Sequence, residues 1–419
     1  MKRLLFIPCT LVLSVTASWS AVIYSGYQNV AIPLDNAGVY LKLDTVNGTP
    51  AFVEPGTFDT EAWINPFFGG TKIGTGAFLR PVVASGGIAN SEQIVNLAVG
   101  TTVDAGSTVA VGVNGSETHV GVGAHQFALG AGGNGLGTPG NIGFKFGANY
   151  GWANTTLNNA GVGIFRDWAY DDAGGSIVVG RVTQSAPVAS TQTFTLSPGT
   201  GESFTLGSAI TDTGGNVNSL IKNGLGATIL SSSHSFTGTT SITSGTLELS
   251  GGSALSATSG VSLNGGTLLF SGAAGNRIND SAGVTLTSAV LSTGGLSESL
   301  GTLTLAGNST IDFGSGASQL TFSSASGTAW SGNLSVWNWT GTVGSGGGTD
   351  RLLFSSNTGN GNITPGNVQF YSGAGSGFLG NGGLVNAGTE LVPVPEPAAL
   401  GGAMVLFSLI AWQERRRRI

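Results

Sequence analysis

The feature that most constrains the fold is a short apolar pattern that recurs in the second half of the chain. It reads T-I-L at 228–230, T-L-E-L at 246–249, T-L-L-F at 267–270, T-L-T at 285–287 and T-L-T-L at 302–305. The starts of these segments are 17 to 21 residues apart, with Gly, Ser or Asn close behind each one. A short strand and tight turns at this interval form one rung of a parallel β-helix.

One such rung cannot bury its apolar face alone, so stacked rungs must share a continuous core. We therefore predict a short right-handed parallel β-helix, or β-solenoid, over residues 187–370. Leu, Ile and Val would stack inward, while Ser and Thr hydroxyls would face water or pair at the corners. A generic Gly/Ser-rich sandwich is the alternative, since periodicity alone does not separate the two folds.

The composition agrees with many short strands joined by small-residue turns. Gly accounts for 72 of the 419 residues, 40% of the residues are hydrophobic and only 9% are charged. Such a chain is too apolar for a disordered linker, and it lacks the G-X-Y period of collagen. Between Val22 and Val392 there are nine basic and nineteen acidic residues, which excludes nucleic-acid binding through a basic patch.

The first 21 residues have the pattern of a secretory signal peptide. Lys2 and Arg3 precede an apolar run over 4–15, and small residues follow. Cleavage is expected after Ala17 or Ser20, because the apolar run is too short for a retained membrane anchor. The single cysteine, Cys9, lies in this segment, so we expect a mature chain without a disulfide, a thiolate nucleophile or a cysteine metal ligand.

The last segment, 393–419, combines three physically different pieces. Alternating prolines give an extended, accessible spacer. The apolar run from Ala398 to Trp412 is about 15 residues long, which is short for a membrane span, and we predict it to be a single transmembrane helix. The basic cluster would stay on the cytoplasmic side; it consists of Arg415, Arg416, Arg417 and Arg418.

The tripeptide Pro395, Glu396 and Pro397, placed directly before this apolar run and the arginines, resembles the sorting tail of PEP-CTERM proteins. The resemblance implies that an exosortase-type enzyme processes the tail. It also implies export to the cell surface or to the extracellular matrix of a bacterium, with transient anchoring in the inner membrane. An ordinary single-pass anchor is the alternative.

Two further stretches of the repeat region carry a resemblance. The run N-G-L-G-A-T-I-L-S-S-S-H-S-F-T-G-T-T-S-I-T-S-G-T-L-E-L-S, from Asn223 to Ser250, resembles the autotransporter-associated β-strand repeat, which implies rungs of an extended surface stalk. The block 330–370 is similar to the one that closes such repeats in PEP-CTERM proteins. Trp337 and Trp339 share one face of its strand, so we expect a cap over the last rung, with an exposed aromatic ligand platform as the alternative.

Residues 22–186 are expected to form a β-sandwich-like N-terminal domain. Its most informative part pairs aromatic residues at alternate positions, which fits a core or a seam between sheets; the residues are Phe144, Phe146, Tyr150, Trp152, Trp168 and Tyr170. The stretches G-F-K-F, N-Y-G-W and D-W-A-Y-D resemble a domain common in PEP-CTERM proteins. Asn149 and Asp171 replace the histidine and glutamate usual there, so any chemistry of that pair is in doubt. Residues 371–392 are expected to be a Gly-rich connector.

The search for catalytic motifs is mostly negative. The G-x-G-x-x-G match over 130–135 is not followed by a helical pattern, which makes it a loop. His119, His125 and His234 are a weak zinc signal. Asp167, Asp171 and Asp172 could hold calcium with backbone carbonyls, but solvated turn acids are the favoured interpretation, because no D-x-D loop repeats.

The sequence therefore predicts an all-β, non-enzymatic surface or matrix protein, without a cofactor or metal, associated with extracellular polysaccharide or biofilm. A secreted carbohydrate-binding or carbohydrate-active module is the alternative. Buried aromatic residues in the N-terminal part would favour a scaffold, and exposed aromatics beside carboxylates would favour the alternative. An autotransporter adhesin is less favoured, because arginines rather than alternating strands end the chain.

Overall fold

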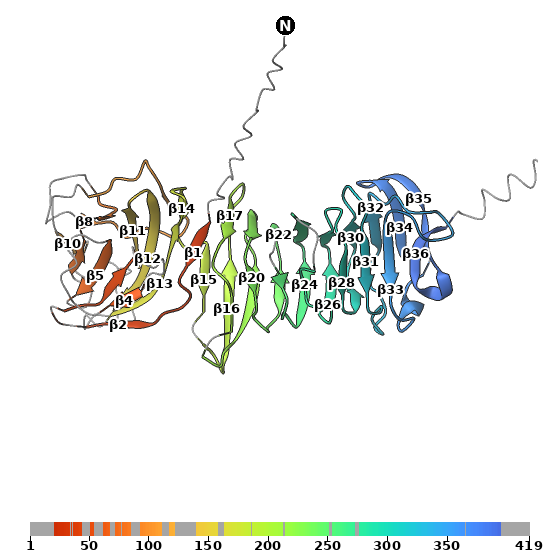
Figure 1. Cartoon of the computed structure of the whole chain (residues 1–419), viewed down its shortest axis with the longest axis horizontal. Coiled ribbons are helices and arrows are strands. Elements are labelled where there is room, and N and C mark those ends of the chain that lie inside the picture. The colour runs from red at the N-terminus through yellow and green to blue at the C-terminus, as the bar shows by residue number, and fades with distance from the viewer. Residues whose placement is uncertain are drawn as a thin grey trace, which may run out of the picture.

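Stacked β-strands make up almost all of the regular structure, from a cluster of N-terminal strands at one end to an antiparallel cap at the other (Figure 1). The computed structural model describes residues 21–33, 35, 37–43, 51–53, 62–67, 72–76, 78–84, 93–110, 117–121, 140–157, 163–185, 187–212, 214–250, 254–272, 276–364 and 366–394. Helix within these ranges is limited to two 3₁₀ segments, Asn360–Asn362 and Asn386–Gly388. The predictions of an all-β chain and of a β-solenoid, which has about six turns, are confirmed.

The solenoid consists of three parallel ladders. The first ladder contains β16 (Thr191–Leu196), β18 (Val217–Lys222), β21 (Thr240–Ile242), β24 (Gly260–Asn264), β26 (Gly283–Thr287) and β29 (Leu303–Leu305). The second contains β17 (Ser203–Leu206), β19 (Ala227–Leu230), β22 (Thr246–Ser250), β25 (Thr267–Ser271), β27 (Val290–Ser292), β30 (Ser309–Asp312), β32 (Leu334–Trp337) and β34 (Val368–Gly373). The third contains β20 (Ser233–His234), β23 (Ala254–Leu255), β28 (Glu298–Leu300), β31 (Gln319–Phe322) and β33 (Arg351–Phe354), with Ile278 bridged to Leu255.

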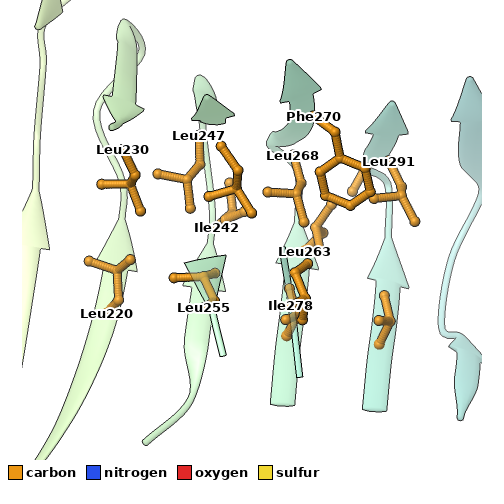
Figure 2. Close-up of a cluster of buried hydrophobic side chains, with 14 of the residues drawn as sticks. Leu220, Leu230, Ile242, Leu247, Leu255, Leu263, Leu268, Phe270, Ile278 and Leu291 are labelled. Carbon is orange, nitrogen blue, oxygen red and sulfur yellow. The ribbon is translucent and has the colours of Figure 1, made fainter. Parts of the chain in front are cut away.

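Alternate residues of each strand point inward and stack on the same residue position of the next rung. One row of the second ladder runs through Thr228, Leu247, Leu268, Leu291, Ile311, Val336 and Phe370. All of these side chains are buried, and Figure 2 shows leucines of neighbouring rungs facing one another in the interior. The ladders thus align one continuous apolar core along the solenoid, as the sequence predicts. Its right-handedness stays a prediction.

The recurring Thr-Leu segments do not all belong to one ladder. Those at 228–230, 246–249 and 267–270 stack directly in β19, β22 and β25, but those at 285–287 and 302–305 lie in β26 and β29 of the first ladder. The reason is that two faces of the solenoid use the same Thr/Leu alternation. Partners in the second ladder are 19 residues apart at Ala227 and Thr246 but 34 apart at Leu334 and Val368.

The N-terminal strands form two large sheets and one small sheet. One continues the second ladder and contains β7 (Leu79–Pro81), β11 (Gly140–Phe146), β12 (Asn149–Leu157), β13 (Gly163–Asp171), β1 (Val22–Tyr24) and β2 (Val30–Ile32). The other has the order β4 (Ala51–Val53), β3 (Tyr40–Lys42), β5 (Trp63–Phe67), β6 (Lys72–Thr75), β10 (Glu117–Gly121) and β8 (Gln93–Ile94). A small sheet pairs β9 (Thr102–Val103) with β14 (Ile177–Val178), and β15 (Val182–Gln184) pairs with β16.

Strand β1 joins the N-terminal strands to the solenoid. It pairs antiparallel with β13 along one edge and parallel with β17 along the other. One core cluster therefore runs from Trp152 in β12 into the solenoid, while a second cluster lies between the two N-terminal sheets. A separate sandwich-like domain over 22–186 stays a prediction, because part of its core is shared.

The C-terminal end consists of strands over the residues 371–392 that the sequence predicts to be a Gly-rich connector. The last two strands of the described residues are β35 (Ser376–Val385) and β36 (Glu390–Val394), which pair antiparallel with each other. In addition, β35 pairs with β34 and β36 pairs with β33. Glycine-rich sequence forms strands here because Gly382 and Gly383 bring the backbone against Val368 and Val394 where a Cβ would collide.

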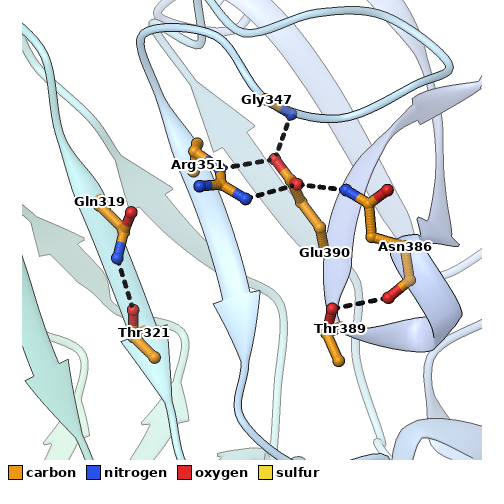
Figure 3. A network of polar contacts seen from close by, with 7 residues as sticks. All are labelled: Gln319, Thr321, Gly347, Arg351, Asn386, Thr389 and Glu390. Atoms are coloured by element: carbon orange, nitrogen blue, oxygen red, sulfur yellow. Dashed lines mark hydrogen bonds and ion pairs between the residues drawn. The ribbon is translucent and has the colours of Figure 1, made fainter.

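An ion pair between the half-buried Arg351 and a buried carboxylate fixes this cap (Figure 3). The Glu390 side chain is fully buried, and its carboxylate accepts hydrogen bonds from the Arg351 guanidinium at 2.9 and 3.1 Å. The Gly347 amide and the Asn386 side chain donate at 2.8 Å each. Burial alone would raise the pKa of Glu390, but these hydrogen bonds lower it below its usual value. The cap is therefore joined to the last rung by a satisfied carboxylate.

The leader predicted over 1–21 and the tail predicted over 393–419 lie outside the described residues except for Ala21, Pro393 and Val394. The part that lies outside includes the run 398–412 predicted as a transmembrane helix. Pro393 and Val394 belong to β36, where Pro393 is buried, so the accessible spacer expected from the alternating prolines does not begin at Pro393. Within the described part of the chain, no helix is long and apolar enough to cross a membrane.

Replacing Thr228 by Val should raise the free energy of unfolding by about 1 kcal/mol. The Thr228 hydroxyl is buried in a row of leucines and has no hydrogen-bond partner among the described residues. Thr240→Val is the matched control, because the buried Thr240 hydroxyl lies 3.2 Å from that of Thr258, and its loss should lower stability. Chemical denaturation measures the free energy of unfolding of both variants. Equal changes in the two variants would contradict the conclusion that the Thr228 hydroxyl is unpaired and the Thr240 hydroxyl is paired.

Replacing Glu390 by Gln should lower the free energy of unfolding of the cap by about 3 kcal/mol, because donors that now reach a buried carboxylate would face an amide nitrogen. Glu202→Gln is the control. Its pair with Arg181 is 31% exposed at the carboxylate, so about 1 kcal/mol or less is expected. Hydrogen exchange of β35 and β36 should accelerate in the first variant only. Unchanged hydrogen-exchange protection of β35 and β36 in Glu390→Gln would disprove that the Arg351–Glu390 pair stabilises the cap.

Candidate functional surfaces

The aromatic pairs of the N-terminal strands are core residues. Phe144, Phe146, Trp168 and Tyr170 lie in the cluster between the two N-terminal sheets, whereas Tyr150 and Trp152 lie in the cluster shared with the solenoid. None of these six side chains is more than 9% exposed. The two clusters are on opposite sides of the β11–β12–β13 sheet, because alternation sends neighbouring strands' aromatic pairs to different faces. These aromatics cannot serve as an exposed platform.

The buried carboxylate of Asp167 is used inside the fold. The Tyr24 hydroxyl donates a hydrogen bond of 2.7 Å to it, which links β1 to β13. Burial raises the pKa of Asp167 to about 6, while the Tyr24 hydrogen bond and the Arg166 charge act in the opposite direction. Tyr24 also packs edge-on against Phe194 of the first rung. Asp167 therefore stabilises the junction instead of facing a ligand.

Asp171 and Asp172 face other partners. An oxygen of Asp171 accepts the Gly175 amide at 2.7 Å and so orders the turn after β13. The Asp172 carboxylate accepts the Ala21 amide at 2.9 Å. The three aspartates are thus directed to separate groups, and the described residues contain no cluster of three acidic, His or Cys side chains suited to a metal ion. The hypothesis of a calcium site gains no support from this geometry.

The histidines are also apart. His119 lies in β10, but nothing is described of its side chain, and His125 lies outside the described residues. His234 is fully buried in the third ladder, where it stacks with Leu255. Its Nδ1 accepts the Ile210 amide at 3.0 Å, and its Nε2 has no partner among the described residues. Burial lowers the pKa of His234 to about 4, so it is neutral at physiological pH.

Trp337 and Trp339 do not share a face, contrary to the sequence expectation. Strand β32 ends at Trp337, and Asn338 adopts the left-handed conformation with φ of 55°. The bend turns Trp339 inward, where it is 2% exposed and packs edge-on against Phe370 at 5.3 Å. Trp337 is only partly buried and lies against the β34–β35 turn at Gly375. One tryptophan therefore belongs to the core and the other to the outer face.

A cavity of about 270 Å³ lies at the junction of the N-terminal strands and the solenoid. Its lining consists of Val22, Thr102, Trp152, Ser176, Ile177, Val178, Arg181, Val182, Glu202, Ser203 and Phe204. The Arg181 guanidinium donates two hydrogen bonds of 2.8 Å to Glu202. Although burial acts to raise it, these bonds and the Gly199 amide lower the pKa of Glu202. The cavity thus holds one carboxylate, already paired.

Two open grooves lie along a corner near the C-terminal end, where strands of the second ladder begin. Their volumes are about 630 and 410 Å³, and both are lined by Asn308 and Asn333. The remaining lining residues of the larger groove are Ala329, Trp330, Ser331, Gly332, Gly361, Asn362, Thr364 and Asn367, and those of the smaller are Ser288, Ala289, Val290, Ser309, Thr310, Ser335 and Gln369. We call the two together the corner groove. None of these residues is charged.

Besides His234, sequence reasoning missed two ionisable residues in the inward rows of the ladders. Lys222 occupies an inward position between Leu196 and Ile242. Its ammonium donates hydrogen bonds to the carbonyls of Gly224 and Ser244 at 2.5 and 3.0 Å. Burial lowers the pKa of Lys222 to about 8. The long aliphatic stem fills the core while the charged end reaches carbonyls at the corner.

Glu298 is the other case. It lies in the inward row of Leu320 and Leu352. Its carboxylate accepts the backbone amides of Arg277 and Ile278 at 3.0 to 3.1 Å. Burial raises the pKa of Glu298 to about 7, and the two amides and the Arg277 charge oppose this. The Glu298 carboxylate thus accepts two backbone amides, those of Arg277 and Ile278, in place of the carbonyl groups of a neighbouring strand. The S-E-S context gives no signal of burial.

No protein-family model, no curated protein and no solved structure matches the chain.

The buried His234 should make the solenoid sensitive to acid. Burial lowers the pKa of the His234 imidazole to about 4 in the folded protein, whereas an unperturbed histidine has a pKa of about 6.5. Between these two pH values the unfolded chain therefore binds a proton that the folded protein does not. Its contribution to the free energy of unfolding is constant above about pH 6.5 and falls by about 3 kcal/mol as the pH drops towards 4.

His234→Asn is the informative variant, because the Asn side-chain oxygen can still accept the Ile210 amide but does not titrate. Denaturant unfolding measured from pH 7.5 to 4 should give the variant a shallower pH dependence than the parent protein. His234→Leu serves as a second non-titrating variant. Identical slopes in all three proteins would show that His234 does not govern acid sensitivity.

Proposed function

We propose that this chain is an exported, non-enzymatic scaffold of a bacterial cell surface or extracellular matrix. In this proposal its PEP-CTERM-type tail is processed by an exosortase-type enzyme. The observation that carries the scaffold role is the continuous core, which runs through stacked rungs from the N-terminal strands to the β35–β36 cap (Figure 1). A rod of this kind resists local opening, because each strand is hydrogen-bonded to rungs on both sides.

The ends of the rod give the proposal a direction. The proposed sorting motif begins at Pro395, immediately after β36. An anchor in the tail would therefore hold the cap end near the membrane, and the N-terminal strands at the opposite end would project outward (Figure 1). The Arg351–Glu390 pair then lies in the part of the rod that transmits force to the anchor.

The carbohydrate-active alternative is less well supported for the N-terminal strands. A glycosidase requires two carboxylates roughly 5 to 10 Å apart in a cleft. Of the described residues that line the junction cavity, only Glu202 is acidic, and Arg181 neutralises it. The aromatic pairs that could hold a sugar there are buried. These observations favour scaffolding.

Expression of the tagged protein in its own host, followed by cell fractionation and intact mass measurement, tests the sorting proposal. We expect a product outside the cytoplasm whose C-terminus lies between Pro393 and Pro397. Triple alanine substitution of Pro395, Glu396 and Pro397 should leave the tail intact and the protein in the membrane. Pro187→Ala, at an exposed proline outside the tail, is the matched control. Full-length parent protein retained in the membrane would refute processing.

A further inference from the structure

The corner groove contains a stack of three asparagines, one from each of the rungs that hold β30, β32 and β34. Ser309 of β30 pairs with Leu334 of β32, which pairs with Val368 of β34. The residues that immediately precede these three partners are Asn308, Asn333 and Asn367. Neighbouring strands of a ladder are about 4.8 Å apart. The groove therefore repeats an amide-bearing position at the interval of a rung, close to the length of one sugar unit in an extended polysaccharide.

The outer two asparagines are held in place by the fold. The Asn308 side-chain oxygen accepts the backbone amide of Asn333 at 2.9 Å. The Asn367 side chain donates to the Asn362 carbonyl at 2.7 Å and accepts the Thr364 amide at 2.9 Å. The Asn333 side chain is exposed and makes no hydrogen bond with another described residue. A fixed polar surface thus surrounds one amide whose donors and acceptor are free for a ligand.

Trp330 supplies an aromatic surface beside this amide. It lines the larger groove and is partly buried, with its ring packed against the solenoid core. Its Nε1 is buried and has no partner among the described residues. Packing holds the ring in one orientation, so stacking of a sugar on its exposed part would cost little side-chain entropy. Aromatic, amide and hydroxyl groups together match a ligand with both C–H faces and hydroxyl edges.

The side chains that line the corner groove favour a ligand without charge. Both parts of the corner groove are lined by amide, hydroxyl, glycine and apolar side chains, with no Lys or Arg to pair with a uronate or sulfate. An acidic chain would lose hydration there without gaining an ion pair. A neutral chain loses no charge hydration, and its hydroxyls can both donate to and accept from the amides.

We propose that the corner groove binds a neutral polysaccharide that runs along the solenoid, with successive sugars over Asn308, Asn333 and Asn367 and one sugar against Trp330. The inference deepens the proposed scaffold function and rests on it for the presence of polysaccharide around the protein. Its chemistry is that of a lectin-like surface on the repeats, distinct from the junction cavity and from the N-terminal aromatics. Binding would align the rod with matrix chains and cross-link them.

Affinity electrophoresis of the purified protein tests the proposal directly. Gels that contain a neutral β-glucan or galactomannan should retard the protein, and gels with the acidic polysaccharide alginate should not. Asn333→Ala should weaken retardation by the neutral polymer about fivefold, because about 1 kcal/mol of hydrogen bonding is lost. Gln319→Ala is the matched control: its exposed amide lies in β31 on the third ladder and has only a 3.5 Å contact with Thr321 (Figure 3).

Two more variants separate binding from folding. Asn333→Arg should abolish retardation by the neutral polymer and introduce retardation by alginate. Trp330→Phe should keep the fold but remove the change in tryptophan fluorescence that the neutral polymer produces. Retardation by alginate alone, by neither class of polymer, or equally strong in the Asn333 variants would overturn the proposal. Because these measurements use purified protein, failure here is distinguishable from failure of sorting, which only fractionation of the host reveals.

Discussion

The structure depends on the stacking of short parallel strands whose inward residues are too few to make a core alone. Each rung buries its leucines only because another rung lies on either side. This makes the two ends of the stack the points of greatest exposure. At one end β1 pairs with both β13 and β17 and brings Trp152 onto the first rungs. At the other, β35 and β36 turn antiparallel and complete the pairing of β33 and β34.

Ionisable groups enter the interior where polar backbone groups can pair with them. Lys222 reaches corner carbonyls, His234 accepts the Ile210 amide and Glu298 accepts the amides of Arg277 and Ile278. The same strategy recurs at Glu390, where a carboxylate receives donors from three segments. The solenoid is therefore stabilised by local polar contacts as well as by its leucine rows.

The functional proposals rest on the polar side chains that stay accessible to solvent once the core is packed. Aromatic residues of the N-terminal strands are used in the core, and the carboxylate of the junction cavity is paired. The outer face of the late rungs keeps amides, hydroxyls and Trp330 accessible. Rigidity and a neutral polar groove on the same rod are the properties expected of a matrix component that contacts polysaccharide.

The sequence by itself determined the all-β class and favoured the solenoid, because Thr/Leu segments that start 17 to 21 residues apart fit stacked rungs, but the periodicity left a sandwich open. It did not determine which ladder each repeat joins, since β25 and β26 have the same alternation on different faces. Nor did it locate Trp339 in the core or the cap in a glycine-rich stretch, because the bend at Asn338 and the pairing of β36 with β33 depend on distant strands. The asparagine stack was invisible for the same reason: Asn333 and Asn367 are 34 residues apart, and only loops of unequal length bring them to neighbouring rungs.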